Sequence, residues 1–327
     1  MRLPTSSKIF QINNVQSFEK EALAIFHFQY QNNEVYKNWC NLIGVPVNEV
    51  KNISQIPFLP ISFFKTHKVV STTFEPSNIF ESSKTTGTIS SKHFVKNIAL
   101  YEQSFMQCFE QFYGSIKNYC VIGLLPSYLE RANSSLVYMT QKLIEQSNCK
   151  ESGFYLNEFE KLHHTLQQLE ARKQPTLLIG VTFALLDFAA LFPLKLQHTI
   201  VMETGGMKGR KEEMTRAEVH NILQNSFSCN TIHSEYGMTE LLSQAYATKN
   251  GIFNCPKWMK VVVQSEDDPL NIQLKGKGIL NIIDLANIYS CSFISTEDVG
   301  VVYENGSFEV QGRLDNSALR GCNLMVV

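Results

Sequence analysis

The residues from 82 to 88, SSKTTGT, form a hydroxyl-rich segment that could bind phosphate. Hydroxyl and backbone N–H groups in a tight turn can surround phosphate oxygens, and a glycine lets the backbone approach them closely. The candidate ligands are Ser82, Ser83, Thr85, Thr86 and Gly87. The same composition is typical of an ordinary surface loop, so this segment needs support from motifs elsewhere in the chain.

A second segment, from Tyr236 to Glu240, combines residue types suited to a nucleotide and its metal ion. The ring of Tyr236 could stack on a base, and Gly237 leaves the backbone free to turn beneath it. Thr239 could contact a phosphate, and Glu240 offers the carboxylate oxygen that Mg2+ prefers. The alternative is a loop tyrosine ahead of a helix that begins near Thr239.

Further residues could complete such a pocket. The turn Gly205-Gly206 would form a floor beneath the base. Asp298 follows a strand-like segment, and its carboxylate could accept hydrogen bonds from two ribose hydroxyls, although a turn aspartate between strands explains the same pattern. The guanidinium of Arg313 can bind ribose or phosphate through two hydrogen bonds.

Taken in order, these motifs resemble those of the adenylate-forming superfamily, which contains acyl-CoA ligases, firefly luciferase and peptide-synthetase adenylation domains. The segment from Tyr236 to Glu240 matches the Y-G-x-T-E pattern completely, and Gly312-Arg313-Leu314-Asp315 resembles the G-R-x-D hinge. The resemblance implies an enzyme that uses ATP and Mg2+. It also implies that Thr239 and Glu240 are catalytic residues and that Glu240 is the metal ligand.

Several positions depart from the patterns of the superfamily. In the phosphate loop, of the form S-S-G-T-T-G-x-P-K, Lys84 replaces a glycine and Ile89 replaces the proline. Lys92 stands two positions after the expected lysine, and we expect it to bind phosphate in place of that lysine. Glu297 replaces the glycine of the T-G-D segment that contains Asp298. These departures keep open a hypothesis of a different class, a catalytically inactive homologue that serves as a binding subunit.

The chain ends shortly after the hinge pattern. Within the superfamily it resembles the bacterial acyl-protein synthetases, the fatty-acid-activating subunits associated with bioluminescence aldehyde synthesis. Supporting matches are residues 125–131, residues 202–210 and the tail Arg320-Gly321-Cys322. The resemblance implies an α/β fold, the adenylate-forming large domain, with α/β layers plus a smaller antiparallel β subdomain and without the small C-terminal domain. We expect the large domain over residues 1–312, and a hinge remnant and mobile C-terminal tail over residues 313–327.

In that family the acyl group passes from an acyl-adenylate to a cysteine near the C-terminus, and then to a partner reductase. The resemblance therefore implies that Cys322 accepts the acyl group. A thiolate on a tail can attack the carbonyl of the adenylate, and the charge of Arg320 would favour the thiolate. The alternative is a thiol that only packs with Leu324 and Met325 at the chain end.

The predicted function is thus ATP-dependent activation of a carboxylic acid, a fatty acid in this family, and formation of a thioester on Cys322. The expected partners are the acid and an acyl reductase or an acyl carrier. An acyl- or aryl-CoA ligase, or a ligase that uses a carrier-protein thiol, is the alternative within the same fold. We expect the pocket for the acid between Val181 and Leu186 and near residues 244–246.

The composition argues against several other classes of protein. A net charge of −1 provides no electrostatic case for binding nucleic acid or an anionic membrane. The eight cysteines form no CxxC or CxxH pair and the histidines form no HExxH motif, so we expect neither a zinc site nor a metalloprotease. Scattered thiols, and a start without an apolar signal region, predict a cytoplasmic protein. Charged residues and a proline interrupt the most apolar stretch, 177–196, so we expect no membrane span.

Apolar periodicity predicts the elements that would position these residues. We expect a helical N-terminal region over 18–42, helices over 97–113, 134–145 and 185–191, and buried strands over 119–125, 175–180 and 198–203. Thr215 and Glu218 form a capping box, which predicts a helix from there to about Leu223. Alternating strands and helices indicate an α/β sheet with helices on its faces. The stretch 55–78, punctuated by prolines, looks irregular, and after about residue 258 short strands predict an antiparallel subdomain.

Overall fold

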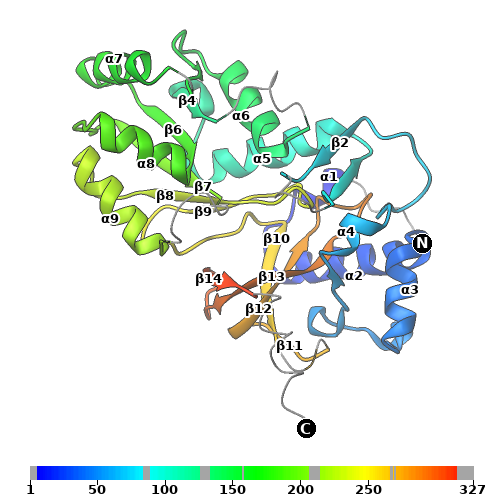
Figure 1. Ribbon diagram of the computed structural model, residues 1–327. Coiled ribbons are helices and arrows are strands. Elements are labelled where there is room, and N and C mark those ends of the chain that lie inside the picture. Colours follow the sequence, from blue (N-terminus) through cyan, green and yellow to red (C-terminus); the bar gives the residue numbers. More distant parts are fainter. Residues whose placement is uncertain are drawn as a thin grey trace.

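Two six-stranded sheets lie side by side in the structure, a computed structural model that describes residues 6–83, 89–125, 133–156, 158–205, 214–265, 268 and 270–314 (Figure 1). One sheet is mostly parallel and carries helices on both faces. The other sheet is mostly antiparallel and packs against the N-terminal helices. The predicted α/β fold with a smaller antiparallel part is confirmed.

The strands of the parallel sheet are β4 (Cys120–Leu124), β5 (Gly153–Phe154), β6 (Thr176–Val181), β7 (Thr199–Thr204), β8 (His233–Tyr236) and β9 (Ala245–Ala247). They lie in the order β5-β4-β6-β7-β8-β9, and only β9 runs antiparallel to its neighbour. Val121 of β4 and Leu177 of β6 belong to one core cluster, whereas the next residues, Ile122 and Leu178, belong to the other. Because side chains alternate along a strand, both faces of the sheet are buried, which explains its uninterrupted apolar runs.

Helices cover both faces of this sheet. One face carries α7 (Phe159–Ala171), α8 (Thr182–Leu191) and α9 (Arg216–Phe227), and the other carries α5 (Ile98–Tyr113) and α6 (Ser135–Gln146). The predicted helices over 97–113, 134–145 and 185–191 are confirmed. The capping box at Thr215 is confirmed as well, but α9 continues to Phe227, beyond the predicted end at Leu223.

The helical region predicted over 18–42 is confirmed, and it consists of two helices, α2 (Val15–Asn32) and α3 (Glu34–Leu42). Asn33 separates them with an extended backbone (φ −110°, ψ 104°), and its side-chain oxygen accepts a hydrogen bond from the N–H of Tyr36 at 3.0 Å. Its side-chain nitrogen donates to the carbonyl of Ser290 at 2.9 Å. A buried asparagine that caps one helix and binds a distant turn thus divides the helical region in two.

The strands of the second sheet are β1 (Leu59–Pro60), β10 (Met259–Gln264), β11 (Ile272–Gln273), β12 (Gly276–Asp284), β13 (Phe293–Val302) and β14 (Phe308–Arg313). Their order is β1-β13-β12-β10-β11, and β14 also pairs with β13. All pairs are antiparallel except β1 with β13. The predicted antiparallel subdomain is therefore confirmed, but one of its strands comes from the stretch 55–78 that looked irregular.

The remaining elements are short: α1 (Ser6–Ile9), α4 (Phe63–Thr66), the 3-10 turns η1 (Val47–Glu49), η2 (Ile53–Gln55) and η3 (Ile116–Asn118), and the strand pair β2 (Asn78–Glu81) and β3 (Lys92–Val95). The helix considered near Thr239 does not form, because residues 237–242 follow β8 as an irregular loop. In the part of the chain that the structure describes, no helix is both long enough and apolar enough to cross a membrane.

A substitution at Gly300 of β13 would test how closely β13 and β14 pack. The register of this pair shifts between Val299 and Gly300, and a Cβ at Gly300 would overlap the carbonyl oxygen of Glu309. We expect Gly300→Ala to lower the free energy of unfolding by about 1–3 kcal/mol, because the backbone of β14 must move. Gly312→Ala in β14 is the control, since a Cβ there has nothing within 4 Å. Denaturant unfolding of both variants measures the difference, and equal losses would contradict it.

Candidate active site

A cavity of about 360 Å³ lies where the two sheets meet. The carboxyl ends of β4, β6, β7 and β8 contribute Leu125, Val181, Gly205 and Gly237 to its lining. Ligands of parallel sheets bind at this edge, because the loops that follow neighbouring strands converge there. The antiparallel sheet closes the other side of the cavity with residues of β13 and β14.

Part of the predicted site converges on this cavity. The predicted residues that line it are Ser82, Ser83, Gly205, Gly237, Thr239, Glu240 and Arg313. They come from the segment after β2, the ends of β7 and β8, and the end of β14. The predicted residues Thr85, Thr86, Gly87, Gly206 and Cys322 lie outside the described residues. Segments far apart in the sequence therefore share one cavity, as a common ligand would require.

Tyr236 does not take the expected position. Its ring is 8% exposed and packs against Phe253 and Phe308, with ring centroids 5.7 and 5.3 Å away, so it does not line the cavity. Its hydroxyl donates a hydrogen bond to Asp298 at 2.8 Å. The other carboxylate oxygen of Asp298 lies 3.5 Å from Nε of Arg313. In this structure Tyr236 thus positions the pair of Asp298 and Arg313 rather than offering a face to a base.

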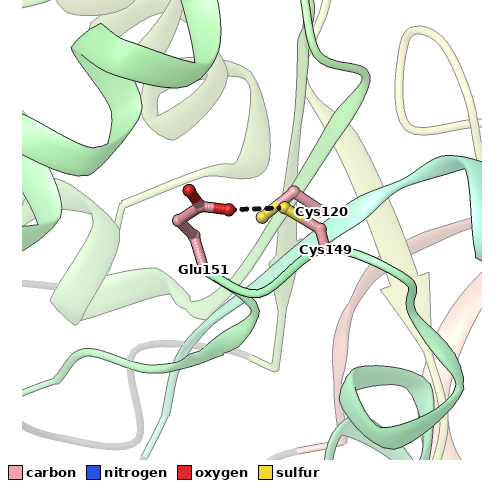
Figure 2. A group of neighbouring side chains, drawn as sticks. All are labelled: Cys120, Cys149 and Glu151. Carbon is pink, nitrogen blue, oxygen red and sulfur yellow. Dashed lines mark hydrogen bonds between the residues drawn. The ribbon is translucent and has the colours of Figure 1, made fainter.

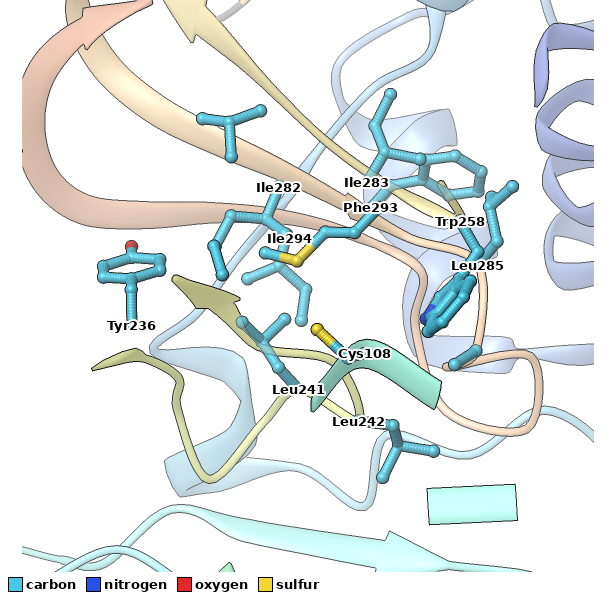
Figure 3. Close-up of a cluster of buried hydrophobic side chains, with 14 of the residues drawn as sticks. Cys108, Tyr236, Leu241, Leu242, Trp258, Ile282, Ile283, Leu285, Phe293 and Ile294 are labelled. Carbon is cyan, nitrogen blue, oxygen red and sulfur yellow. The ribbon is translucent and has the colours of Figure 1, made fainter. Parts of the chain in front are cut away.

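The loop that follows β8 is fixed by the end of β12 and the turn that follows it. The buried carboxylate of Asp284 accepts hydrogen bonds from the backbone N–H groups of Leu242 and Ser243 at 2.8 and 3.0 Å, and from the Ser243 hydroxyl at 2.6 Å. The side chains of Leu241 and Leu242 are buried in the core next to this turn (Figure 3). The irregular backbone of the loop therefore finds its hydrogen-bond partners in the antiparallel sheet.

Two more side chains hold the carbonyl groups of Thr239 and Glu240. Asn287 donates a hydrogen bond to the Glu240 carbonyl at 2.7 Å, and Nδ1 of His93 lies 2.8 Å from the Thr239 carbonyl oxygen. Nε2 of His93 lies 3.0 Å from the side-chain oxygen of Asn287. Burial lowers the pKa of His93 to about 4, so the ring is neutral near pH 7. A neutral ring has one N–H group, and both of its contacts are with oxygen atoms that can only accept. Only one of the two contacts is therefore a hydrogen bond.

Glu240, the candidate metal ligand, is 5% exposed. Burial raises the pKa of its carboxyl, although a hydrogen bond with Ser91 and the charges of Arg313 and Lys65 oppose the shift. A carboxylate that has lost most of its water gains from a bound dication, and Mg2+ prefers such hard oxygen donors. The residue therefore fits a metal ion that would also bind phosphate oxygens and water.

The lysine that lines the cavity is not the expected Lys92. Nζ of Lys92 lies 3.4 Å from Glu81, its side chain is 53% exposed, and it does not line the cavity. Lys65 of α4 does line the cavity. The lining also contains Glu235, whose carboxylate accepts a hydrogen bond from the Thr204 hydroxyl. The sequence could have indicated Glu235 as a site residue, because it stands beside Tyr236 at the end of a predicted motif. Lys65 gave no such signal, because it lies in the stretch 55–78 that looks irregular.

A buried carboxylate behind the cavity ties α9 to the sheets. Glu203 lies 3.2 Å from Nε of Arg216 and 3.5 Å from Nε2 of His220. Burial raises the pKa of Glu203, but His220 and Arg216 outweigh it and hold the pKa below the usual range. Arg216 also donates to the carbonyl of Val310 at 3.1 Å and lies over the ring of Phe253. This cluster joins the parallel sheet to β14, which carries Arg313.

A second group of polar side chains lies away from the cavity, at the start of β4. The thiol of Cys149 donates to Glu151 at 3.0 Å, and Cys120 lies beside them (Figure 2). The hydrogen bond from Arg172 to Glu151, at 2.8 Å, lowers the pKa of Glu151 to about 2, and burial raises the pKa of Cys120. Because Arg172 already binds the carboxylate and the Cys120 thiol stays protonated, we interpret the group as structural.

Comparison with known proteins decides the family. The acyl-protein synthetase family, LuxE, matches residues 8–327. This chain belongs to that family. It is thus an enzyme of the ligase class, and the predicted resemblance is confirmed. It is also 24% identical over 339 residues to the long-chain-fatty-acid–luciferin-component ligase of Aliivibrio fischeri, over 91% of this chain and 85% of that relative.

Solved structures show the same fold. A 2-hydroxyisobutyryl-CoA ligase in its postadenylation state is similar with a TM-score of 0.61 and 10% identity, over 92% of this chain and 68% of that one. A long-chain-fatty-acid-CoA ligase from Archaeoglobus fulgidus is similar with a TM-score of 0.50 and 16% identity, over 76% and 53%. The O-succinylbenzoate coenzyme A synthetase of Bacillus subtilis, in complex with ATP and magnesium, has a TM-score of 0.50 and 13% identity, over 72% and 49%. This chain thus spans about half the length of two of these ligases.

The raised pKa of Glu240 predicts a pH-dependent affinity for a divalent metal. A proton and the metal compete for one carboxylate, so the affinity should fall as the pH falls toward this raised pKa, at a higher pH than for an ordinary glutamate. Titration of Mn2+ in place of Mg2+, with ATP present and over about pH 5 to 8, measures the affinity by electron paramagnetic resonance. Glu240→Gln reports the titration of ATP alone. The prediction is wrong if wild type and variant change in parallel.

Proposed function

We propose that this protein activates a fatty acid with ATP, forming an acyl-adenylate, and transfers the acyl group to Cys322 as a thioester. The observation that carries the first half is the convergence of Ser82, Thr239, Glu240 and Arg313 on one cavity. Hydroxyls, a carboxylate and a guanidinium are the groups that bind phosphate and its metal ion. Family membership and fold support the use of ATP and the activation of an acid.

The acid is proposed to be a fatty acid. The Aliivibrio fischeri relative is named for a long-chain fatty acid. The lining of the cavity also offers apolar side chains for an acyl chain, namely Ile61, Tyr101, Leu136, Met139 and Val181. Of the residues expected around the acid, Val181 and Gln244 line the cavity, whereas Leu186 and Tyr246 are buried in the core. The acyl chain would therefore lie toward α5 and α6.

In the first step, an oxygen of the acid carboxylate would attack the α-phosphorus of ATP, and the bond from that phosphorus to pyrophosphate would break. Ser82, Ser83 and Thr239 would donate hydrogen bonds to phosphate oxygens. Glu240 would hold Mg2+, which when bound neutralises phosphate charge. Arg313 would bind ribose or phosphate from the opposite sheet, oriented by Asp298.

In the second step, the sulfur of Cys322 would attack the carbonyl of the adenylate. The carbon–oxygen bond of the mixed anhydride would break, AMP would leave with the electron pair, and the thiol proton would pass to solvent. A reductase or an acyl carrier would then receive the acyl group from Cys322.

The division of the chain into a large domain up to residue 312 and a tail from residue 313 stays a prediction. The described chain remains paired with β13 at Leu314, whose N–H donates to the Glu297 carbonyl at 2.7 Å.

Exchange of labelled pyrophosphate into ATP tests the first half of the proposal. A series of fatty acids of increasing length should support the exchange with Mg2+ present. Shorter and aromatic acids are the comparison. If no acid supports exchange, the inactive homologue is favoured instead. If the enzyme releases acyl-CoA as its main product when coenzyme A is added, the CoA ligase is favoured.

Glu240→Gln separates activity from stability. We expect pyrophosphate exchange to fall about 100-fold or more, because a metal-held phosphate contact stabilises developing charge in the transition state. The free energy of unfolding should not fall, because a neutral amide avoids the desolvation that raises the pKa of Glu240. Exchange assays and denaturant unfolding measure the two quantities. Normal exchange with Mg2+ as the only metal would contradict the assigned role.

Cys322→Ala should form acyl-adenylate normally but never accumulate acylated protein, because only the second step needs a nucleophile on this chain. Incubation with labelled fatty acid, ATP and Mg2+, followed by mass spectrometry of the intact protein, is the measurement. Cys229→Ala, at a half-buried thiol near the end of α9, is the matched control and should be acylated like wild type. A hydroxylamine-labile acyl group on Cys322→Ala would mean that another residue is the acceptor.

A further inference from the structure

We propose that Lys65 binds the triphosphate of ATP in this cavity and stabilises the negative charge that develops as pyrophosphate leaves. This inference rests on the proposed function. The described lining of the cavity contains two cationic side chains, Lys65 and Arg313. Arg313 already lies 3.5 Å from Asp298 and 3.7 Å from Glu297. A ligand with several negative charges needs a cation that acidic side chains have not already neutralised.

Lys65 meets that requirement within the part of the chain that the structure describes. None of the ion pairs or hydrogen bonds among these residues involves its ammonium group. Its charge is close enough to Glu240 to favour the ionised form of that carboxyl. The proposed metal ligand and the proposed phosphate cation therefore share one region of the cavity. Ser82 and Ser91 line the same cavity and offer hydroxyl groups.

The backbone that carries Lys65 is anchored to both halves of the site. Strand β1 pairs with β13, and the N–H of Ile61 donates to the Ser295 carbonyl at 2.9 Å. Phe64, which directly precedes Lys65, is 1% exposed and packs edge to face against the ring of His93, with ring centroids 6.0 Å apart. His93 in turn contacts the Thr239 carbonyl. The position of Lys65 is thus coupled, through packed rings, to the loop that carries Glu240.

Lys92, the lysine expected from the sequence, is less suited to this role. Both lysines are exposed, but Lys65 lines the cavity and Lys92 does not, because side chains alternate in β3 and it is His93 that is buried against the Thr239 loop. Lys92 pairs with Glu81, at 3.4 Å. The geometry therefore assigns to an N-terminal residue the phosphate contact that the sequence pattern places after the hydroxyl-rich loop.

Substitution of each lysine distinguishes the two positions. We expect Lys65→Met to lower kcat/KM for ATP in pyrophosphate exchange about 10- to 100-fold, since the lost cation faces developing charge. Affinity for ATP without metal, measured by calorimetry, should fall about tenfold, whereas affinity for adenosine and KM for the fatty acid should change less than about twofold. Lys65→Arg should recover part of the loss. Lys68→Met, three residues further along and outside the lining, is the control and should behave like wild type.

The outcomes separate this inference from the proposed function. If Lys65→Met exchanges pyrophosphate as fast as wild type, or if only Lys92→Met loses exchange activity, the role of Lys65 is overturned and the proposed function stands. An equal loss of ATP and adenosine affinity in Lys65→Met shows a merely structural role and also overturns it. If wild type exchanges no pyrophosphate with any acid, the proposed function fails, and the calorimetric comparison of ATP with adenosine still decides on Lys65.

Discussion

The site depends on one constraint: the irregular loop between β8 and β9 must pack against the antiparallel sheet while it holds Glu240 out of water. A buried backbone N–H or carbonyl without a partner costs about 1–3 kcal/mol. Asp284, at the end of β12, and Asn287, in the turn that leads to β13, provide these partners for the loop. The same turn accepts hydrogen bonds from Gln29 and Asn33 of the N-terminal helices. The sheets cannot separate at this turn without unpairing several buried groups at once.

Carboxylates near the cavity differ in their partners, and their pKa values shift in opposite directions. Glu203 lies beside Arg216 and His220, so its pKa is low despite burial. Burial dominates for Glu240 and Asp298, whose pKa values are raised. The charge of Glu203 is balanced by its neighbours inside the protein, and the residue holds parts of the fold together. Glu240 has only weaker help from more distant cations, which leaves it suited to a cation that arrives with a substrate.

The N-terminal region belongs to the site rather than to a separate support. Strand β1 completes the antiparallel sheet, and α4 directly afterwards delivers Lys65 to the cavity. Residues 237–244 reach the same cavity from the parallel sheet. A site assembled from both sheets and from the N-terminal segment needs all three to be folded before it exists. Binding of a nucleotide there would therefore stabilise the whole described fold.

The sequence by itself determined the parallel strands, the capped helix at Thr215 and the complete motif from Tyr236 to Glu240, because these depend on local periodicity and residue type. Their order along the chain also sufficed to indicate the family. Only the tertiary structure decided that Lys65 rather than Lys92 lines the cavity, and that Tyr236 packs its ring in the core. Side-chain direction, burial and distant hydrogen bonds made these choices. They depend on contacts between residues far apart in the sequence, which no local pattern contains.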